Sequence, residues 1–144
     1  MAIELWLEVQ MRLNIKLMNP LEGKITHPQV VKKSWGEEIW TLNNKELNLC
    51  SKLLNVNSER GFHFHSHLNK KEQFFVFRGT VKYFEIDPET REVCSIILNV
   101  GDSIFINPAT SHSILALKDS VIIETSTFHE DSDSYRTHLN PEIK

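Results

Sequence analysis

The sequence contains little of what would place it in several common protein classes. Its two cysteines, Cys50 and Cys94, form no CxxC pair and are too few for a disulfide framework. We interpret both as small buried hydrophobic residues in a reducing cytoplasm. The net charge of -3 lacks the basic excess typical of nucleic-acid-binding proteins. No apolar run approaches the ~20 residues that a membrane-spanning helix needs.

The amino terminus also lacks the pattern of a secretory signal. Its apolar residues are interrupted by Glu4, Glu8, Gln10 and Arg12, so no continuous hydrophobic region is present. We therefore expect a cytoplasmic protein with neither a membrane nor a nucleic-acid partner. A length of 144 residues, of which 40% are hydrophobic and 24% charged, suits one globular domain with its own core.

Residues 3–17 show a pattern of their own. Apolar residues alternate from Ile3 to Leu17 with a period of two, which is typical of an amphipathic strand. The segment is longer than the usual strand of about 5–6 residues. Three interpretations remain open: a strand that crosses to a partner subunit, a helix, or a non-native extension before Met18. We favour the first, which predicts a homodimer: residues 1–17 form an amino-terminal extension, within which residues 3–17 add an edge strand to the partner's sheet.

From Trp35 onward the chain reads as short strands separated by turn residues. A good type I turn, Asp87-Pro88-Glu89-Thr90, is an example of these separators. Turn signals recur about every 8–12 residues with no helical window between them, which predicts an all-β sandwich or barrel. The tail over residues 130–144 carries little pattern and could be a short helix, a loop or disordered. The predicted strands cover residues 37–42, 47–56, 62–67, 72–77, 81–86, 93–98, 103–107, 112–117 and 121–126.

Three histidines alternate along one of these strands. Because successive side chains of a strand point to opposite faces, His63, His65 and His67 should share one face. The same rule places Phe62 and Phe64 on the opposite face. Two imidazoles at i and i+2 on one strand are close enough to bind the same metal ion.

Two further donors complete a candidate metal site. Glu72 follows a short loop after His67 and can return to the same interior on the next strand, and His112 begins another strand after a turn. Imidazole nitrogens with one carboxylate suit a divalent transition metal ion, namely Fe, Mn, Ni, Co or Zn. In an octahedral metal, four protein ligands leave two positions for water, dioxygen or a chelating substrate.

The spacing of these residues resembles the double motif of the cupin superfamily. In that family the first motif runs from HxH over three or four residues to Glu and then over six to Gly, and His65, His67, Glu72 and Gly79 fit it. The second motif ends in a histidine that fits His112, at the family's distance from Gly101.

The second motif also departs from the family. Asn107 stands where the family has proline and Ala109 where it has glycine. In the first motif, only three residues separate Gly61 from His65, where the family has five. The resemblance covers about residues 30–136. It implies that residues 18–144 form a single all-β cupin domain, a double-stranded β-helix of the jelly-roll type. It also implies one divalent metal ion held by His65, His67, Glu72 and His112, whereas His63 fits better as a cavity residue beside them.

A narrower resemblance concerns the ends of this region. Residues 33–37 look like the Pro-Trp-Gly segment that opens the cupin domain of type II phosphomannose isomerases, although Ser34 replaces the proline. Residues 123–127, followed by Tyr135 and Arg136, are similar to the sequence that closes that domain. The likeness implies a small-molecule substrate, in particular a sugar or sugar phosphate, and metal-dependent isomerisation or epimerisation.

Such a reaction needs a base that moves a proton between neighbouring carbons. His63, Glu124 and Tyr135 are the candidates by position. Arg78 and Arg136 are the candidate phosphate-binding residues, with Lys82 as a weaker one. Two alternatives stay open: a mononuclear iron dioxygenase, which can use the same ligands, and a non-catalytic module that binds a sugar or a metal ion.

Overall fold

The computed structural model describes residues 21–144, so the predicted shared strand over residues 3–17 lies outside the described part. Short 3-10 turns are present at η1 (Glu22–Lys24) and η2 (Asp131–Asp133). The strands are β1 (Gln29–Lys33), β2 (Gly36–Asn44), β3 (Leu49–Val56), β4 (Gly61–Ser66), β5 (Glu72–Arg78), β6 (Thr80–Ile86), β7 (Val93–Asn99), β8 (Ser103–Ile106), β9 (His112–Ala116), β10 (Ser120–Ser126) and β11 (Tyr135–His138).

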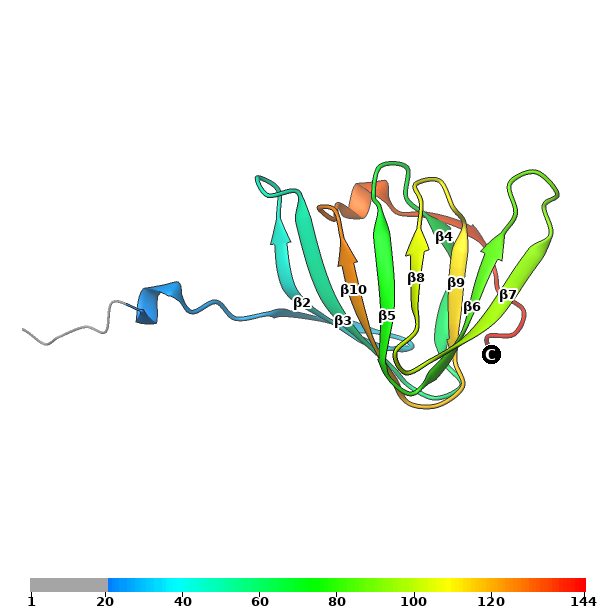
Figure 1. Ribbon diagram of the computed structural model, residues 1–144, viewed down its shortest axis with the longest axis horizontal. Coiled ribbons are helices and arrows are strands. Elements are labelled where there is room, and N and C mark those ends of the chain that lie inside the picture. Colours follow the sequence, from blue (N-terminus) through cyan, green and yellow to red (C-terminus); the bar gives the residue numbers. More distant parts are fainter. Residues whose placement is uncertain (1–20) are drawn as a thin grey trace, which may run out of the picture.

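The strands form two antiparallel sheets that pack face to face (Figure 1). One sheet has six strands in the order β1-β2-β3-β10-β5-β8, and the other has five in the order β11-β4-β9-β6-β7. Consecutive strands therefore often lie in different sheets, which is the arrangement of a jelly roll. The segment around η1 extends away from the two sheets (Figure 1).

All nine strands predicted from the sequence are present, and their bounds shift by only a few residues. Two strands were not predicted. Strand β1 pairs with β2 through a tight turn, and β11 pairs with β4 from within the tail that showed little sequence pattern. β11 matters for the site, because it brings the tail against the strand that carries the histidines.

The core lies between the sheets and follows the alternation of the strands. On β3, for example, Leu54 and Val56 face inward, and on β10 Ile122 does the same. A second, smaller cluster of Phe64, Phe84 and Leu115 lies on the other face of the five-stranded sheet. Burial of these aliphatic and aromatic side chains leaves the remaining inward positions for polar residues.

The expectation that both cysteines are buried is wrong for Cys94. Both cysteines are free, and Cys50 is buried as expected, but Cys94 is exposed. Cys94 lies on β7, an edge strand of which six of the seven residues are exposed, so alternation does not bury one face there.

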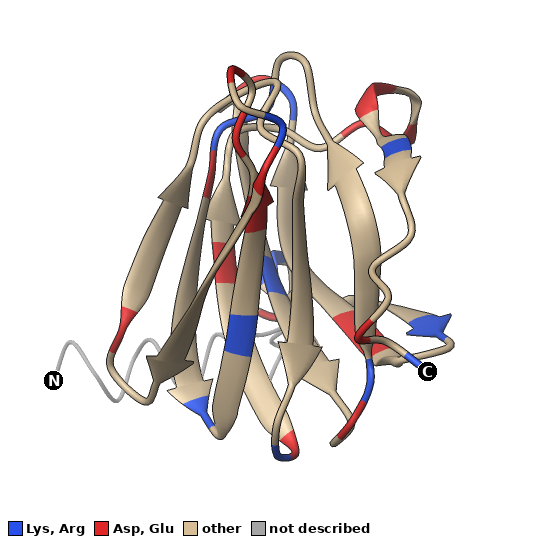
Figure 2. Cartoon of the chain, turned by 90° about the vertical axis from the view of Figure 1, so that its right-hand side faces the viewer, with Lys and Arg blue, Asp and Glu red and all other residues tan. Residues whose placement is uncertain are grey.

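In the described residues no helix is long and apolar enough to cross a membrane. Acidic and basic residues are mixed along the strands and loops (Figure 2).

Candidate metal centre

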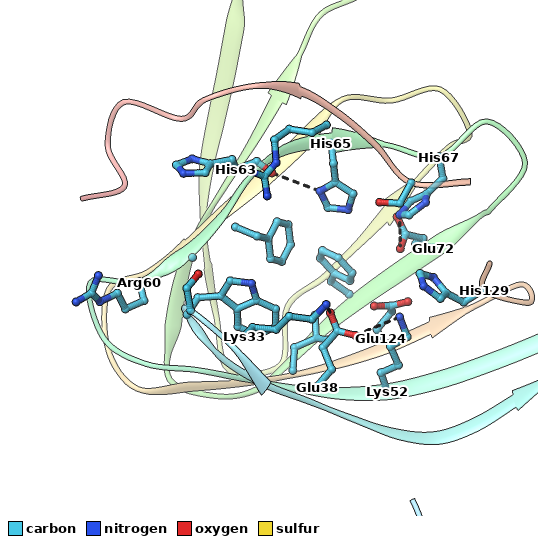
Figure 3. A pocket seen from close by; sticks show the side chains of 18 of the residues that line it. Lys33, Glu38, Lys52, Arg60, His63, His65, His67, Glu72, Glu124 and His129 are labelled. Carbon is cyan, nitrogen blue, oxygen red and sulfur yellow. Dashed lines mark hydrogen bonds and ion pairs between the residues drawn. The ribbon is translucent and has the colours of Figure 1, made fainter. Parts of the chain in front are cut away.

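The space between the sheets holds a polar cavity of about 570 Å³. It runs along β4 of one sheet, opposite β3, β5 and β10 of the other (Figure 3). His65, His67 and Glu72 line it, and His112 packs directly behind, with its ring centroid 4.4 Å from that of His65. The structure thus brings together the four residues that the sequence predicted as metal ligands.

Phe62 also faces this cavity, contrary to the prediction that it lies opposite the histidines. Its ring centroid is 5.1 Å from that of His65. The reason is a register shift between Phe62 and His65 where β4 pairs with β9, because a bulge breaks strict alternation. Phe64, beyond the bulge, does point to the other face and packs on Phe84. Phe62 therefore forms an apolar wall beside the imidazoles.

The backbone fixes the orientation of all three imidazoles. Nδ1 of His112 lies 3.0 Å from the carbonyl oxygen of Thr110, and Nδ1 of His67 lies 2.7 Å from that of Asp133. His65 Nδ1 has a longer contact, 3.4 Å, with the carbonyl oxygen of His63. A carbonyl only accepts, so each Nδ1 carries the proton and each Nε2 keeps a lone pair. Metal-binding histidines are commonly held in this way.

Two of these lone pairs face the carboxylate of Glu72. His112 Nε2 lies 3.3 Å from Glu72 Oε2, and His67 Nε2 lies 3.6 Å from Glu72 Oε1. His112 Nε2 is buried and makes no hydrogen bond. Burial and the charge of Glu124 raise the pKa of Glu72, and when its proton leaves, two acceptors face each other here. A cation can then bind to both, and ligands about 2.1 Å from one ion and at right angles would lie about 3 Å apart. The donor set therefore fits a divalent metal ion.

The electrostatics favour neutral histidines. Burial lowers the pKa of His112 to about 4. Burial, assisted by the charge of Lys70, also lowers the pKa of His67 to about 4. For His65, burial and the neighbouring His112 bring the pKa well below its usual range. Neutral imidazoles are the form that binds metal, so no proton has to leave these rings near neutral pH.

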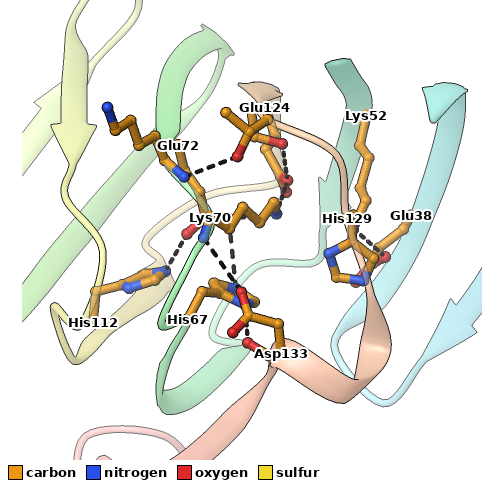
Figure 4. Close-up of polar contacts among 12 residues, drawn as sticks. Glu38, Lys52, His67, Lys70, Glu72, His112, Glu124, His129 and Asp133 are labelled. Atoms are coloured by element: carbon orange, nitrogen blue, oxygen red, sulfur yellow. Dashed lines mark hydrogen bonds and ion pairs between the residues drawn. The ribbon is translucent and has the colours of Figure 1, made fainter. Parts of the chain in front are cut away.

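Lys70 connects the centre to a second buried carboxylate (Figure 4). Its ammonium group donates to Glu72 Oε1 at 2.6 Å and also to Glu124 Oε1. Burial lowers the pKa of Lys70, but the two carboxylates outweigh this and raise it above its usual value. Burial likewise raises the pKa of Glu124, yet Lys70 and Lys52 hold it below the usual range. Lys70 is therefore an ammonium ion and Glu124 a carboxylate, whereas burial and the charge of Glu124 raise the pKa of Glu72 above its usual value.

Asp133 holds the loop that carries Lys70. Its carboxylate accepts hydrogen bonds from the backbone N–H groups of Leu68, Asn69 and Lys70, at 2.9 to 3.3 Å. Among residues 21–144, no group of three or more His, Cys, Asp or Glu side chains is already arranged to hold a metal ion. Lys70 occupies Glu72 Oε1. Glu72 Oε2, on the side of His112, is the carboxylate oxygen that Lys70 leaves available.

Sequence reasoning missed Lys70, Asp133, Lys52 and His129. Lys52 carried a usable signal, because it shares the inward parity of Leu54 on β3 and is buried in the cavity wall. Lys70 and Asp133 carried none. One lies in a polar loop and the other in the tail, and only the tertiary fold brings them together.

The candidate catalytic and substrate residues fall into two groups. Glu124 and His63 line the cavity, and His63 Nδ1 accepts the backbone N–H of Asn140 at 3.1 Å. Arg136 lines the cavity at its exposed side. Tyr135 does not line it and is 47% exposed, because neighbours on β11 point to opposite faces.

The remaining phosphate candidates lie outside the cavity. Arg78 shares the parity of Glu72 but is exposed, since it is the last residue of β5, where the pairing with β10 shifts register opposite Val121. Lys82 forms an ion pair with Glu142 at 2.8 Å, away from the cavity. The structure therefore leaves Arg136 as the sequence-predicted cation at the cavity.

The fold is similar to that of two proteins of known structure. An oxalate decarboxylase from Bacillus subtilis matches 76% of this chain and 30% of its own, with a TM-score of 0.66 and 16% identity. CapF from Staphylococcus aureus, a capsular polysaccharide assembling protein, matches 83% of this chain and 35% of its own, with a TM-score of 0.68 and 13% identity. Both are cupins, and this chain has the cupin fold.

The chain spans about a third of the length of these two proteins. No protein-family model matches the sequence, and no curated protein matches it significantly. At this level of identity the similarity establishes the architecture, while function has to be argued from the site.

Proposed function

We propose that this cupin binds one divalent transition metal ion through His65, His67, Glu72 and His112. The observation that carries the proposal is the buried Nε2 of His112, which makes no hydrogen bond and faces a carboxylate oxygen 3.3 Å away. Three imidazoles with one carboxylate suit Fe, Mn, Ni, Co or Zn. When bound, such an ion would act as a Lewis acid toward the oxygens of a carbonyl or hydroxyl group.

We further propose that the cavity takes a carbohydrate or its phosphate and that the protein isomerises or epimerises it. A volume of about 570 Å³ lies within the range of small-molecule sites. Lys33, Arg60 and Arg136 line the outer part of the cavity and could bind a phosphate group there. Carboxylates and ammonium groups line the inner part, where they can bind hydroxyl groups.

Within this proposal Glu124 is the candidate base, and Lys70 stabilises the negative charge that develops during proton transfer. Glu124 Oε1 accepts hydrogen bonds from Lys70 and Ser126, so Oε2 is the candidate atom to take a proton from the substrate. The Lys70 ammonium group, between Glu124 and Glu72, stabilises negative charge that develops on the substrate oxygen. His63 lines the same cavity and is a second candidate base.

Metal binding is tested first, by calorimetric titration of each metal into chelator-treated protein. We expect one equivalent to bind to the wild type. His112→Gln and His67→Gln should each weaken binding at least 100-fold, while circular dichroism remains that of the wild type. His27→Gln is the matched control, because His27 is exposed and outside the cavity. A wild type without a metal equivalent, or unaltered binding in both cavity variants, would overturn the proposal.

Activity is tested next, on metal-loaded protein. Mannose, fructose and lyxose, each with and without phosphate, serve as binding probes and as isomerisation substrates. Interconversion of an aldose and a ketose that stops in Glu124→Gln supports the isomerase proposal. Oxygen uptake that requires iron, without isomerisation, would replace it with the dioxygenase alternative. Sugar binding without turnover would leave a binding module.

A further inference from the structure

A second group of polar residues lies beside the metal centre and has no part in it. His129 follows β10 and lines the cavity, with its ring centroid 6.0 Å from that of His67 (Figure 3). Its ring packs edge-on against Trp40 at 4.9 Å. Lys52, from β3, lines the same part of the cavity and places its ammonium group 4.1 Å from the centre of the Trp40 ring.

The position of His129 is fixed on several sides. Its backbone N–H donates to Asn43 Oδ1 at 2.9 Å, and its carbonyl oxygen accepts from Asn43 Nδ2 at 3.0 Å. On the ring, Nε2 lies 3.1 Å from Asp131 Oδ1. A carboxylate accepts, so Nε2 carries the proton and Nδ1 keeps its lone pair.

That lone pair has no partner within the described chain. His129 is only 9% exposed, and its Nδ1 is buried without a hydrogen bond. Buried polar atoms are almost always satisfied, so an exception that lines a cavity points to a ligand. Lys52 and Lys70 also lower the pKa of His129, after burial as the largest cause, which keeps the ring neutral.

Lys52 supplies a donor beside this acceptor. It is 2% exposed, and its nearest carboxylate oxygen, Glu38 Oε2, is 3.5 Å away. Glu38 Oε2 already accepts the Trp40 Nε1–H at 2.7 Å, so it is shared between two donors. An ammonium group has three N–H bonds, and Lys52 therefore retains capacity to donate to a ligand.

We propose that His129 and Lys52 form a subsite for a substrate hydroxyl group. A hydroxyl can donate to His129 Nδ1 and accept from Lys52, whereas a carboxylate or phosphate would place its own lone pairs against Nδ1. The subsite adjoins His67, so a polyol held at the metal centre can extend one hydroxyl to it. This inference rests on the proposed carbohydrate function and makes His129 a residue that determines substrate specificity.

The test compares two replacements of His129 in metal-loaded protein. His129→Phe keeps an aromatic ring against Trp40 but removes the acceptor, whereas the side-chain oxygen in His129→Asn can replace Nδ1. The probes are mannose, fructose and lyxose, and the monodeoxy analogues of whichever sugar binds best. We expect His129→Phe to weaken that sugar about tenfold. His129→Asn should recover part of the loss, and both variants should keep wild-type metal affinity.

A second readout separates a hydrogen bond from a packing effect. One monodeoxy analogue should bind to the wild type about as weakly as the parent sugar binds to His129→Phe. The affinity of that analogue should be the same in His129→Phe as in the wild type. The nitrogen resonance of unprotonated Nδ1 in 15N-histidine-labelled protein should also shift when the sugar is added. His27→Phe is the control for a histidine outside the cavity.

The outcomes separate the two proposals. Wild-type affinity for the sugar in His129→Phe, with no shift of the Nδ1 resonance, overturns the subsite and leaves the proposed function intact. A wild type that binds none of the sugars overturns the carbohydrate function and the subsite with it. Equal weakening by His129→Phe and His129→Asn, without rescue, also counts against a hydrogen bond to Nδ1.

Discussion

The two sheets contribute different chemistry to the same cavity. The five-stranded sheet supplies neutral nitrogen donors, His65 on β4 and His112 on β9. The six-stranded sheet supplies charges, Lys52 on β3, Glu72 on β5 and Glu124 on β10. Neither sheet alone contains a complete set of ligands, so the candidate site depends on the packing of one sheet against the other.

The imidazoles and the buried carboxylates are also held in position by different interactions. Each imidazole is held by a carbonyl oxygen of the backbone, so it needs no partner of opposite charge. The buried carboxylates instead depend on Lys70, which reaches them from the loop between β4 and β5. A buried charge that loses its partner is far more costly than a neutral ring that loses a hydrogen bond. The charged side of the cavity should therefore be the more sensitive one.

The largest effect of a single substitution is expected for Lys70→Met in metal-free protein. The substitution leaves Glu72 and Glu124 buried without their shared cation, so the free energy of unfolding should fall by about 3–5 kcal/mol. Urea unfolding in the presence of a chelator measures this loss. Added divalent metal should restore part of it, because a ligand that binds the folded state stabilises it.

The chain offers a matched control for this substitution in the next residue. Lys71 lies in the same loop but is exposed, so Lys71→Met should change the free energy of unfolding by no more than about 0.5 kcal/mol. Equal losses in the two variants would show that the buried ion pairs do not stabilise this side of the cavity.

The neutral side of the cavity predicts a pH dependence. The folded-state pKa of His67 and of His112 is about 4, below the ordinary value of 6.5. The unfolded chain then binds more protons than the folded protein between about pH 4 and 6.5, so stability falls as the pH falls through this window. Each ring contributes roughly 3 kcal/mol to the full effect, and His65, whose pKa is also lowered, adds to it.

Glu72 works in the opposite direction. Burial and the charge of Glu124 raise its folded-state pKa, so its contribution to stability is present below pH 4.5 and is lost as the pH rises. Four histidines with a lowered pKa, His65, His67, His112 and His129, outweigh this one carboxylate, so a net loss of stability toward acid is still expected. Urea unfolding of chelator-treated protein at pH 4.5, 5.5 and 6.5 measures it, and His112→Phe should reduce the slope. Stability that is constant or greater at pH 4.5 would contradict the assignment of neutral rings.

Local sequence patterns account for the residues and strands that were named in advance. The metal-ligand candidates are marked by local spacing, since His65 and His67 are two apart and Glu72 starts the next strand. The strands were predicted because alternation and turn residues are local properties as well. Glu124 was named by its place in β10, where it shares the inward parity of Ile122.

What the sequence did not predict depends on contacts between distant segments. Asp133 caps the loop of Lys70 across more than sixty residues, and β11 was missed because its four residues are all exposed. The inward turn of Phe62 results from a bulge in the pairing of β4 with β9, which no pattern within β4 itself reveals.

A smaller effect, on ligand affinity, is expected for the substitution of Arg136, a charged residue of the five-stranded sheet. Arg136 on β11 lines the cavity from an exposed position, so under the proposed function it would bind the phosphate of a sugar phosphate. Arg136→Ala should weaken a sugar phosphate about tenfold, or about 1.4 kcal/mol, and leave the unphosphorylated sugar unchanged. Arg78→Ala is the control, because Arg78 is exposed outside the cavity. Equal weakening of both sugars by Arg136→Ala would argue against a phosphate contact.

The smallest effect concerns the turn that connects the two sheets, between β8 and β9. Ala109, at the position where cupins have glycine, adopts a φ of 62° and donates its N–H to the carbonyl oxygen of His67 at 2.6 Å. The left-handed region costs a residue with a Cβ about 1–2 kcal/mol, while glycine loses about 0.4–1 kcal/mol through the entropy of the unfolded chain. Because the methyl group of Ala109 is exposed, its loss removes little packing.

Ala109→Gly should therefore raise the free energy of unfolding by about 0.5 kcal/mol and leave metal affinity unchanged. Arg91→Gly is a matched comparison, since Arg91 has a φ of 64° in the hairpin between β6 and β7, away from the cavity. Similar gains in urea unfolding would mean that Ala109 is strained only by its backbone angle. A gain at Arg91 together with a loss at Ala109, and weaker metal binding, would instead mean that the stiffer alanine turn helps to position His67 and His112 between the two sheets.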